Sequence, residues 1–261
     1  MEFEGKVALV TGASSGIGRA TALRLAAEGC AIGVLGRDRD KVEEAVAEIR
    51  QAGGRAIPLL ADVASAEDMD GAVASLVAEF GRLDVLFANA GINGVWAPID
   101  EITPEEWDRT INTNLRGTYL TLHYGVPHLK RAGGGAVVIT ASVNGTRIFS
   151  NAGATAYSAT KAAQVAMTQM LALELAKFRI RVNVVCPGAI ETAIDESTTK
   201  RHEEVAGEPV EFPEGEIPLT DGEPGTAEEV AELVAFLLSD RARHISGTPV
   251  WIDGAESLLK G

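Results

Sequence analysis

Residues 6–18 read Lys-Val-Ala-Leu-Val-Thr-Gly-Ala-Ser-Ser-Gly-Ile-Gly. The apolar start predicts a buried strand, and the glycine-rich remainder predicts a turn that opens a helix reaching about Glu28. Such a helix start binds anions through its N–H groups and dipole, and glycines let a pyrophosphate approach the backbone. The spacing differs from the G-x-G-x-x-G form, and a plain glycine-rich connector is the alternative. The residues expected to contact a dinucleotide are Gly12, Ser14, Ser15, Gly16, Ile17 and Gly18.

A second strand is predicted over residues 31–35, with Gly36 and Arg37 directly after it. In a dinucleotide-binding fold the end of this strand reads the adenosine ribose. An acidic residue there binds the 2′-hydroxyl, whereas an arginine suits a 2′-phosphate. Because Gly36 offers no carboxylate and Arg37 follows it, the sequence favours NADP(H) over NAD(H). The alternative is a solvated Arg37 paired with Asp38.

The third strand, predicted over residues 56–60, contains Pro58, which a sheet tolerates on an edge strand. This suits a sheet ordered 3-2-1-4-5-6, in which the third strand lies at the edge. Asp62-Val63 follows the strand and is expected to meet the adenine ring, although the carboxylate could merely start the next helix. A fourth strand over residues 85–88 ends in Asn89-Ala90-Gly91, a small turn expected to pass under the cofactor.

A loop is predicted over residues 92–103, with Trp96 and Pro98 exposed enough to touch a substrate. Thr103 followed by Pro104 indicates a capped helix start at the end of this loop.

The helix pattern after that start is interrupted by Asn112, Asn114 and Gly117. These residue types are poor helix formers, so we expect a local kink with a specific task. A polar helix face is the alternative.

Tyr157 and Lys161 lie four residues apart, on one face of a helix predicted over about 155–177. A phenol with a pKa of roughly 10 is a poor acid or base near neutral pH, but a nearby ammonium lowers that pKa. Lys161 is therefore expected to tune Tyr157 for general acid–base catalysis. Ser142 follows an apolar run at 137–139, so it is expected at a strand end facing a site. Taken alone, the Tyr-x-x-x-Lys spacing also arises by chance on helix surfaces.

The continuation of this helix, residues 162–176, is apolar on nearly every face. A helix that is hydrophobic all round must be covered on both sides. One side can face the sheet, and we expect the other to face a partner subunit of a homo-oligomer, a dimer or a tetramer.

A further strand is predicted over residues 181–185, and it leads into Pro187-Gly188. Residues 193–225 are rich in Glu, Pro and Thr and are weakly periodic, which indicates a substrate loop or lid. A disordered acidic surface loop is the alternative. A capped helix over 226–238 and a last strand over 249–252 follow.

The alternation of strands and helices predicts one α/β domain over residues 1–261. We expect a Rossmann-type doubly wound, mostly parallel sheet in the order 3-2-1-4-5-6-7, with helices on both faces. Ligands should then lie at the C-terminal strand ends, where the polar turns gather.

The net charge of −14 argues against nucleic acids and anionic membranes as partners. The chain shows no signal peptide or membrane span, and Cys30 and Cys186 form no disulfide framework, so we expect a cytoplasmic protein. No metal is expected, because the four histidines are scattered without ligand spacing.

Over essentially its whole length the chain resembles the short-chain dehydrogenase/reductase family. The matching elements, in order, are Thr11-Gly-x-x-x-Gly-x-Gly18, Asp62-Val63, Asn89-Ala-Gly91, Asn114, Ser142, Tyr157-x-x-x-Lys161 and Pro187-Gly188-x-x-x-Thr192. The resemblance implies hydride transfer between a nicotinamide and a carbonyl or alcohol carbon. Members of this family commonly assemble as tetramers or dimers through the Tyr-bearing helix, and the resemblance implies the same for this chain.

The resemblance also implies residue roles. Tyr157 would be the general acid in reduction and the general base in oxidation, while Lys161 would bind the nicotinamide ribose and lower the tyrosine pKa. Ser142 would hydrogen-bond the substrate oxygen, and Asn114 would hold a water that relays protons to Lys161. The implied cofactor contacts beyond the glycine-rich turn are Arg37, Asp62, Val63, Asn89, Ala90, Gly91, Tyr157, Lys161, Pro187, Gly188, Ile190 and Thr192.

Two departures from the family pattern stand out. The interval from Ser142 to Tyr157 is about two residues longer than usual, and Asp253-Gly254-Ala255 replaces a more usual double glycine. The first bears on the pocket shape, for which we expect contributions from residues 94–96, 143–149 with Asn144 and Arg147, Ile190 and the 193–225 segment.

The leading hypothesis is an NADP(H)-preferring carbonyl reductase or alcohol dehydrogenase. A catalytically silent cofactor sensor or scaffold on the same fold is the alternative, and a dehydratase or enoyl reductase is a third. Because the 193–225 segment is acidic, we expect a small or medium carbonyl substrate rather than a polyanion.

Overall fold

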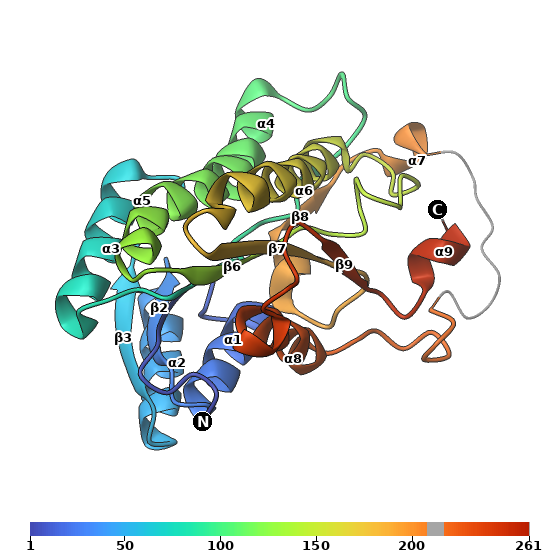
Figure 1. Ribbon diagram of the computed structural model, residues 1–261. Helices are drawn as coiled ribbons and strands as arrows, with labels where there is room; N and C mark the ends of the chain where they lie inside the picture. Colours follow the sequence, from blue (N-terminus) through green and yellow to red (C-terminus); the bar gives the residue numbers. More distant parts are fainter. Residues whose placement is uncertain (208–216, 261) are drawn as a thin grey trace.

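The computed structural model describes residues 1–207 and 217–260. Within these ranges, seven strands form one parallel sheet (Figure 1). They are β1 (Val7–Thr11), β2 (Ala31–Gly36), β3 (Arg55–Leu60), β4 (Val85–Ala88), β6 (Gly135–Thr140), β7 (Ile180–Pro187) and β9 (Pro249–Ile252). A second, two-stranded sheet pairs β5 (Gly94–Trp96) with β8 (Thr198–Lys200).

The order of the large sheet is β3-β2-β1-β4-β6-β7-β9. β5 and β8 belong to the small sheet. When only the seven strands of the large sheet are numbered in chain order, their order is the predicted 3-2-1-4-5-6-7. Pro58 lies in β3, an edge strand of the sheet. An edge strand has no neighbour on its outer side, so the N–H that proline lacks is not needed for a hydrogen bond there. Every residue of β1 and β4 is buried, as expected for parallel strands covered on both faces. The predicted fold class is confirmed.

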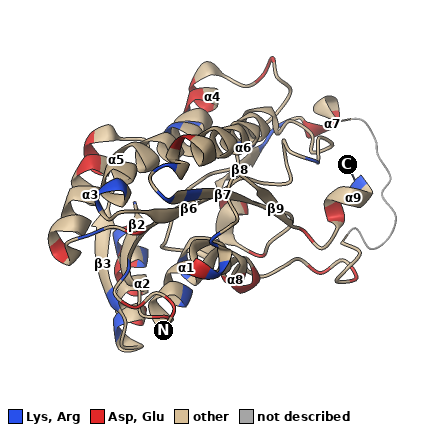
Figure 2. Ribbon diagram, in the orientation of Figure 1, with Lys and Arg blue, Asp and Glu red and all other residues tan. Residues whose placement is uncertain are grey.

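Helices cover both faces of the sheet (Figure 1). Those on one face, α1, α2 and α8, build one apolar core, and α3, α5 and α6 build the other. Figure 2 shows charged residues mainly on helices and loops, with the sheet largely free of them. The longer helices are α1 (Gly16–Ala27), α2 (Arg39–Gln51), α3 (Ala66–Phe80), α4 (Pro104–Ile111), α5 (Gly117–Arg131), α6 (Thr155–Ala176) and α8 (Ala227–Leu238). The short ones are α7 (Glu203–Ala206), α9 (Glu256–Lys260) and two 3-10 turns, η2 (Ala193–Ser197) and η3 (Asp240–Ala242).

Side-chain caps fix where several helices begin. Thr103 starts α4 and Thr226 starts α8, each through a complete capping box with a glutamate three residues later. Both starts were predicted from the sequence and are confirmed.

The predicted kink lies between α4 and α5. Residues Asn112–Arg116 form a π-helical turn, η1, whose wider winding inserts an extra residue into the helix. This turn places Asn114 wholly inside the protein, beside α6. The expected interruption of the helix is therefore present as a π-helical turn, from which one polar side chain, that of Asn114, lies buried.

Two local expectations need correction. The 92–103 loop contains β5, and its Pro98 is buried rather than exposed to a substrate. The first part of the 193–225 segment contains η2, β8 and α7, whereas residues 208–216 lie outside the described part. A three-residue strand whose partner lies about a hundred residues away leaves no local signal in the sequence.

The long helix α6 is apolar on more than its sheet-facing side. Leu175 is buried against the sheet, while Met170 and Leu173 are 74% and 84% exposed. In the described part of the chain, no helix is long and apolar enough to cross a membrane.

Candidate active site

A cavity of about 790 Å³ lies at the C-terminal ends of β1, β4, β6 and β7. This is where a parallel α/β sheet places its ligand crevice. Fourteen of the predicted site residues line it: Gly12, Ser15, Gly16, Ile17, Asn89, Ala90, Gly91, Ser142, Tyr157, Lys161, Pro187, Gly188, Ile190 and Thr192.

The glycine-rich turn between β1 and α1 is built for close backbone approach. Gly12 has a φ of +65°, and a Cβ atom at Gly18 would overlap the carbonyl oxygen of Gly12. The side chain of Ser15 makes no capping hydrogen bond, and the first turn of α1 carries no acidic residue. The N–H groups of this turn are thus available to an anion, which fits the pyrophosphate of a dinucleotide. Gly18 serves packing and does not line the cavity.

The Asn89-Ala90-Gly91 turn is tied to the ends of two neighbouring strands. The N–H groups of Asn89 and Ala90 donate to Thr11 Oγ1 over 3.0 and 3.1 Å. The Asn89 amide also donates to the Thr11 carbonyl and accepts from the Thr140 hydroxyl. These bonds hold the turn rigidly across the cavity floor.

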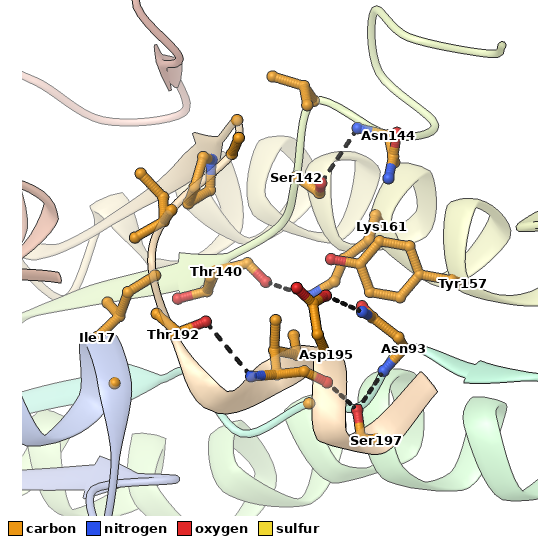
Figure 3. A pocket seen from close by; sticks show the side chains of 18 of the residues that line it. Ile17, Asn93, Thr140, Ser142, Asn144, Tyr157, Lys161, Thr192, Asp195 and Ser197 are labelled. Atoms are coloured by element: carbon orange, nitrogen blue, oxygen red, sulfur yellow. Dashed lines mark hydrogen bonds between the residues drawn. The ribbon is translucent and has the colours of Figure 1, made fainter. Parts of the chain in front are cut away.

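Ser142, Tyr157 and Lys161 meet in this cavity (Figure 3). Ser142 follows β6 by two residues, and its hydroxyl accepts a 3.1 Å hydrogen bond from the N–H of Asn144. Tyr157 and Lys161 come from the first two turns of α6, and Lys161 Nζ lies 5.3 Å from the centre of the Tyr157 ring. All three side chains are buried.

Burial dominates the titration of these groups. It raises the pKa of Tyr157 to about 12, against a lowering contribution from its hydrogen bonding with Ser142. It lowers the pKa of Lys161 to about 8. The expectation that Lys161 would bring the pKa of Tyr157 down is therefore wrong for this structure. Removing a phenolate from water is the largest cause of the raised pKa, and Lys161 is not among the groups that shift it.

Asn114 stands behind the cavity and does not line it. Its side chain exchanges two hydrogen bonds with the backbone of Ile92 and donates to Thr160 Oγ1. Its own carbonyl accepts from Gln164 Nε2 and Thr118 Oγ1. A Cβ atom at Gly91 would lie 3.3 Å from Asn114 Oδ1 and 3.6 Å from Lys161 Nζ, so both side chains approach this glycine closely.

Comparisons with known proteins agree with this geometry. Residues 6–203 match the family model described as short chain dehydrogenase. Cyclohexanol dehydrogenase of Acinetobacter sp. (strain SE19) is 40% identical over 258 residues, which are 97% of this chain and 96% of that protein. The chain belongs to the short-chain dehydrogenases.

Solved structures of other short-chain dehydrogenases superpose over nearly the whole chain. A 3-ketoacyl-ACP reductase from Sinorhizobium meliloti 1021 is 63% identical, with a TM-score of 0.94 over 97% of this chain and 99% of that one. A 3-ketoacyl-(acyl-carrier-protein) reductase from Brucella melitensis, complexed with NADH, is 34% identical, with a TM-score of 0.86 over 98% and 99%. As a member of this family, the chain is a nicotinamide-dependent oxidoreductase that transfers a hydride to or from a carbonyl or alcohol carbon. Nothing in these matches supports a silent sensor or scaffold.

Outside the cavity, this short-chain dehydrogenase places Arg37 as predicted, at the end of β2. The side chain is exposed, and among residues 1–207 and 217–260 it has no hydrogen-bond or ion-pair partner. Asp38 instead caps α2 by accepting from the N–H of Lys41, so Arg37 is solvated as the alternative had it but is not paired with Asp38. Ser14 lies beside Gly36, the residue preceding Arg37.

Asp62 and Val63 shape the turn after β3. The Asp62 carboxylate accepts from the N–H of Ala64, and Val63 packs where Gly117 of α5 has no side chain. Neither lines the cavity, and contact with an adenine ring stays a prediction.

The expected substrate lining is partly confirmed. Trp96, Val143, Asn144 and Ile190 line the cavity. Arg147 does not, because its guanidinium stacks 3.7 Å from the centre of a Trp251 ring.

Sequence reasoning expected the 193–225 segment at the pocket without naming Asp195 or Ser197, and it missed Asn93. Asn93, Asp195 and Ser197 line the cavity facing Tyr157 (Figure 3). They meet because β5 and β8 pair, which only the tertiary structure reveals. Glu256 of α9 was also missed, and it accepts a 3.2 Å hydrogen bond from the N–H of Ala189.

Proposed function

We propose that Tyr157 is the general acid–base residue of an NADP(H)-preferring carbonyl reductase or alcohol dehydrogenase. The observation that carries this proposal is the meeting of Ser142, Tyr157 and Lys161 in one cavity with an uncapped, glycine-rich helix start. Acid–base groups and an anion site then share one crevice.

The residues divide the work between binding and proton transfer. Ser142 would hold the substrate oxygen, and Tyr157 would give that oxygen its proton in reduction or remove it in oxidation. Lys161 would bind the ribose, and residues 187–192 with the Asn89-Ala90-Gly91 turn would hold the nicotinamide end. Asn114 would support a proton relay toward Lys161. The bound nicotinamide supplies or accepts the hydride.

The preference for NADP(H) rests on Arg37. A guanidinium without a partner, next to a glycine that offers no carboxylate, suits a 2′-phosphate. The Brucella relative was solved with NADH, so both cofactors belong in the test.

A homo-oligomer, a dimer or tetramer, fits the outer face of α6. Met170 and Leu173 are large apolar side chains left in water on a helix whose other side packs on the sheet. A partner subunit would remove that surface from water. The two buried, unpaired cysteines fit a reducing compartment such as the cytoplasm.

The single domain would carry a substrate lid in the 193–225 segment. Its first part lines the cavity, and Arg201 anchors it by binding both carboxylate oxygens of Glu106 over 3.0 Å each. Amide hydrogen exchange beyond residue 201 should slow when cofactor and substrate are both bound, and unchanged exchange would contradict the lid.

For the substrate, we propose a neutral carbonyl compound of small or medium size. The cavity is lined by the carboxylates of Asp195, Glu191 and Glu256 and, within the described ranges, by one ammonium, Lys161. Such a lining disfavours polyanions. Tight productive binding of an acyl carrier protein would overturn this.

The deciding experiment follows NADPH and NADH absorbance with a carbonyl panel that includes cyclohexanone. Tyr157→Phe should lose 10²- to 10⁴-fold in kcat, on the order of what general acid–base catalysis supplies. Tyr124→Phe, a change of the same kind on α5, should keep wild-type activity. A Tyr157→Phe variant as active as wild type would rule out the tyrosine role, and a clear preference for NADH would rule out the Arg37 argument alone.

A further inference from the structure

Asp195 projects a carboxylate into the cavity from η2 (Figure 3). In that view the carboxylate lies near the Tyr157 hydroxyl. Its charge raises the pKa of Tyr157, which agrees with this nearness. No role in the chemistry proposed above requires a negative charge at this place.

The position of Asp195 is held from both sides. The N–H of Asn93 donates to Ser197 Oγ over 3.0 Å, and the Asn93 amide donates to Thr198 Oγ1 over 2.8 Å. The Ser197 hydroxyl donates a 2.6 Å hydrogen bond to the carbonyl oxygen of Ile194. η2 is therefore fastened to the chain leading into β5, and the carboxylate is presented by a fixed backbone.

Most of the acceptor capacity of this carboxylate is unused. Its one hydrogen bond, from Asn93 Nδ2, is long at 3.4 Å, and Oδ2 has no partner in residues 1–207 and 217–260. An ionised carboxylate offers about four acceptor sites. The hydrogen bond that Lys161 makes among the described residues goes to the carbonyl of Thr140 and not to this carboxylate.

The neighbouring lining is apolar. Trp96, Ile148 and Ile194 line the same cavity as Asp195 and Ser142. A substrate that covered Asp195 with hydrocarbon alone would strip water from a charge without replacing its hydrogen bonds, and that is costly.

We propose that Asp195 is the subsite for a second hydroxyl group of the substrate, so that the enzyme acts on hydroxyketones and the matching diols. This proposal rests on the proposed function, in which Ser142 and Tyr157 already take the reacting oxygen. The hydrocarbon between the two oxygens then packs against the apolar lining.

Equilibrium binding tests the subsite without requiring turnover. Cyclohexanol and 1,2-, 1,3- and 1,4-cyclohexanediol are titrated by calorimetry into NADPH-saturated protein, in which the reduced cofactor cannot accept a hydride from the alcohol. At least one diol should bind wild type about tenfold more tightly than cyclohexanol, as expected for one hydrogen bond to a charged group. Asp195→Ala should reduce the ratio of diol affinity to cyclohexanol affinity to about one. Asp195→Asn, which keeps the shape of the side chain, should lower the ratio as well. Glu196→Gln, on the same turn, should leave the ratio unchanged.

Equal binding of cyclohexanol and all three diols by wild type would overturn the subsite. So would a diol preference that survives in both Asp195 variants. The same proteins assayed with cyclohexanone and the hydroxycyclohexanones separate the two proposals. Tyr157-dependent turnover without hydroxyl preference leaves the function standing and removes the subsite. Diol binding that depends on Asp195, without any turnover that depends on Tyr157, leaves the subsite standing and removes the proposed function.

Discussion

Lys161 Nζ donates a 2.8 Å hydrogen bond to the carbonyl oxygen of Thr140, the last residue of β6. Two residues further along the chain lies Ser142, and four residues earlier on α6 lies Tyr157. One buried ammonium thus joins the end of the strand that leads into Ser142 to the helix that carries the phenol.

The burial of Lys161 predicts a pH-dependent stability. Its pKa falls from 10.5 unfolded to about 8 folded, so between these values the unfolded chain binds more protons and stability rises with pH. Tyr157, raised to about 12, acts in the opposite direction only above about pH 10. Burial also raises the pKa values of Cys30 and Cys186 to about 12, so both thiols lower the stability as pH rises above about 9. In urea unfolding of cofactor-free protein between pH 8 and 10, the slope of stability against pH should therefore be more positive in wild type than in Lys161→Met, by at most about 1.4 kcal/mol per pH unit. The exposed Lys41→Met is the control, and an unchanged slope in Lys161→Met would contradict the buried ammonium.

Arg37→Ala should weaken NADPH binding about 10- to 100-fold and leave NADH binding within about twofold, because only the 2′-phosphate meets the guanidinium. Fluorescence titration of each cofactor measures this directly. Arg39→Ala removes a neighbouring arginine that pairs with Glu43, and it should leave both affinities unchanged. Equal losses for the two cofactors in Arg37→Ala would show that the residue does not read the phosphate.

Leu173→Glu should dissociate the assembly, because a charge replaces an apolar side chain that the partner would bury. Losing a buried leucine costs about 2 kcal/mol or more on each side of a twofold interface, about a thousandfold in Kd. Sedimentation velocity at micromolar concentration checks the outcome. Glu174→Gln, the next residue on α6, should sediment as wild type does. A wild-type protein that is already monomeric would end the oligomer proposal.

Most of the fold could be predicted because its signals are local. Pro58 marks an edge strand, Thr103 and Thr226 mark helix starts, and the Asn112–Gly117 run marks the π-helical turn. Each rests on a residue whose backbone preference differs strongly from that of its neighbours.

The remainder depends on contacts between distant parts of the chain. Asp195 faces Tyr157 only because β5 pairs with β8, and Arg147 leaves the cavity because Trp251, about a hundred residues on, offers its ring. The pKa of Tyr157 could not be foreseen either. A sequence shows that an ammonium is near, but it does not show how much water the fold excludes.

The carboxylate of Glu106 serves two parts of the molecule at once. It completes the capping box at the start of α4 by accepting from the N–H of Thr103. It also accepts hydrogen bonds from both terminal nitrogens of the Arg201 guanidinium. The first turn of an outer helix and the chain between β8 and α7 are therefore thermodynamically linked. When one frays the other loses a partner, so the two should open and close as a single cooperative unit rather than as a helix and a separate loop.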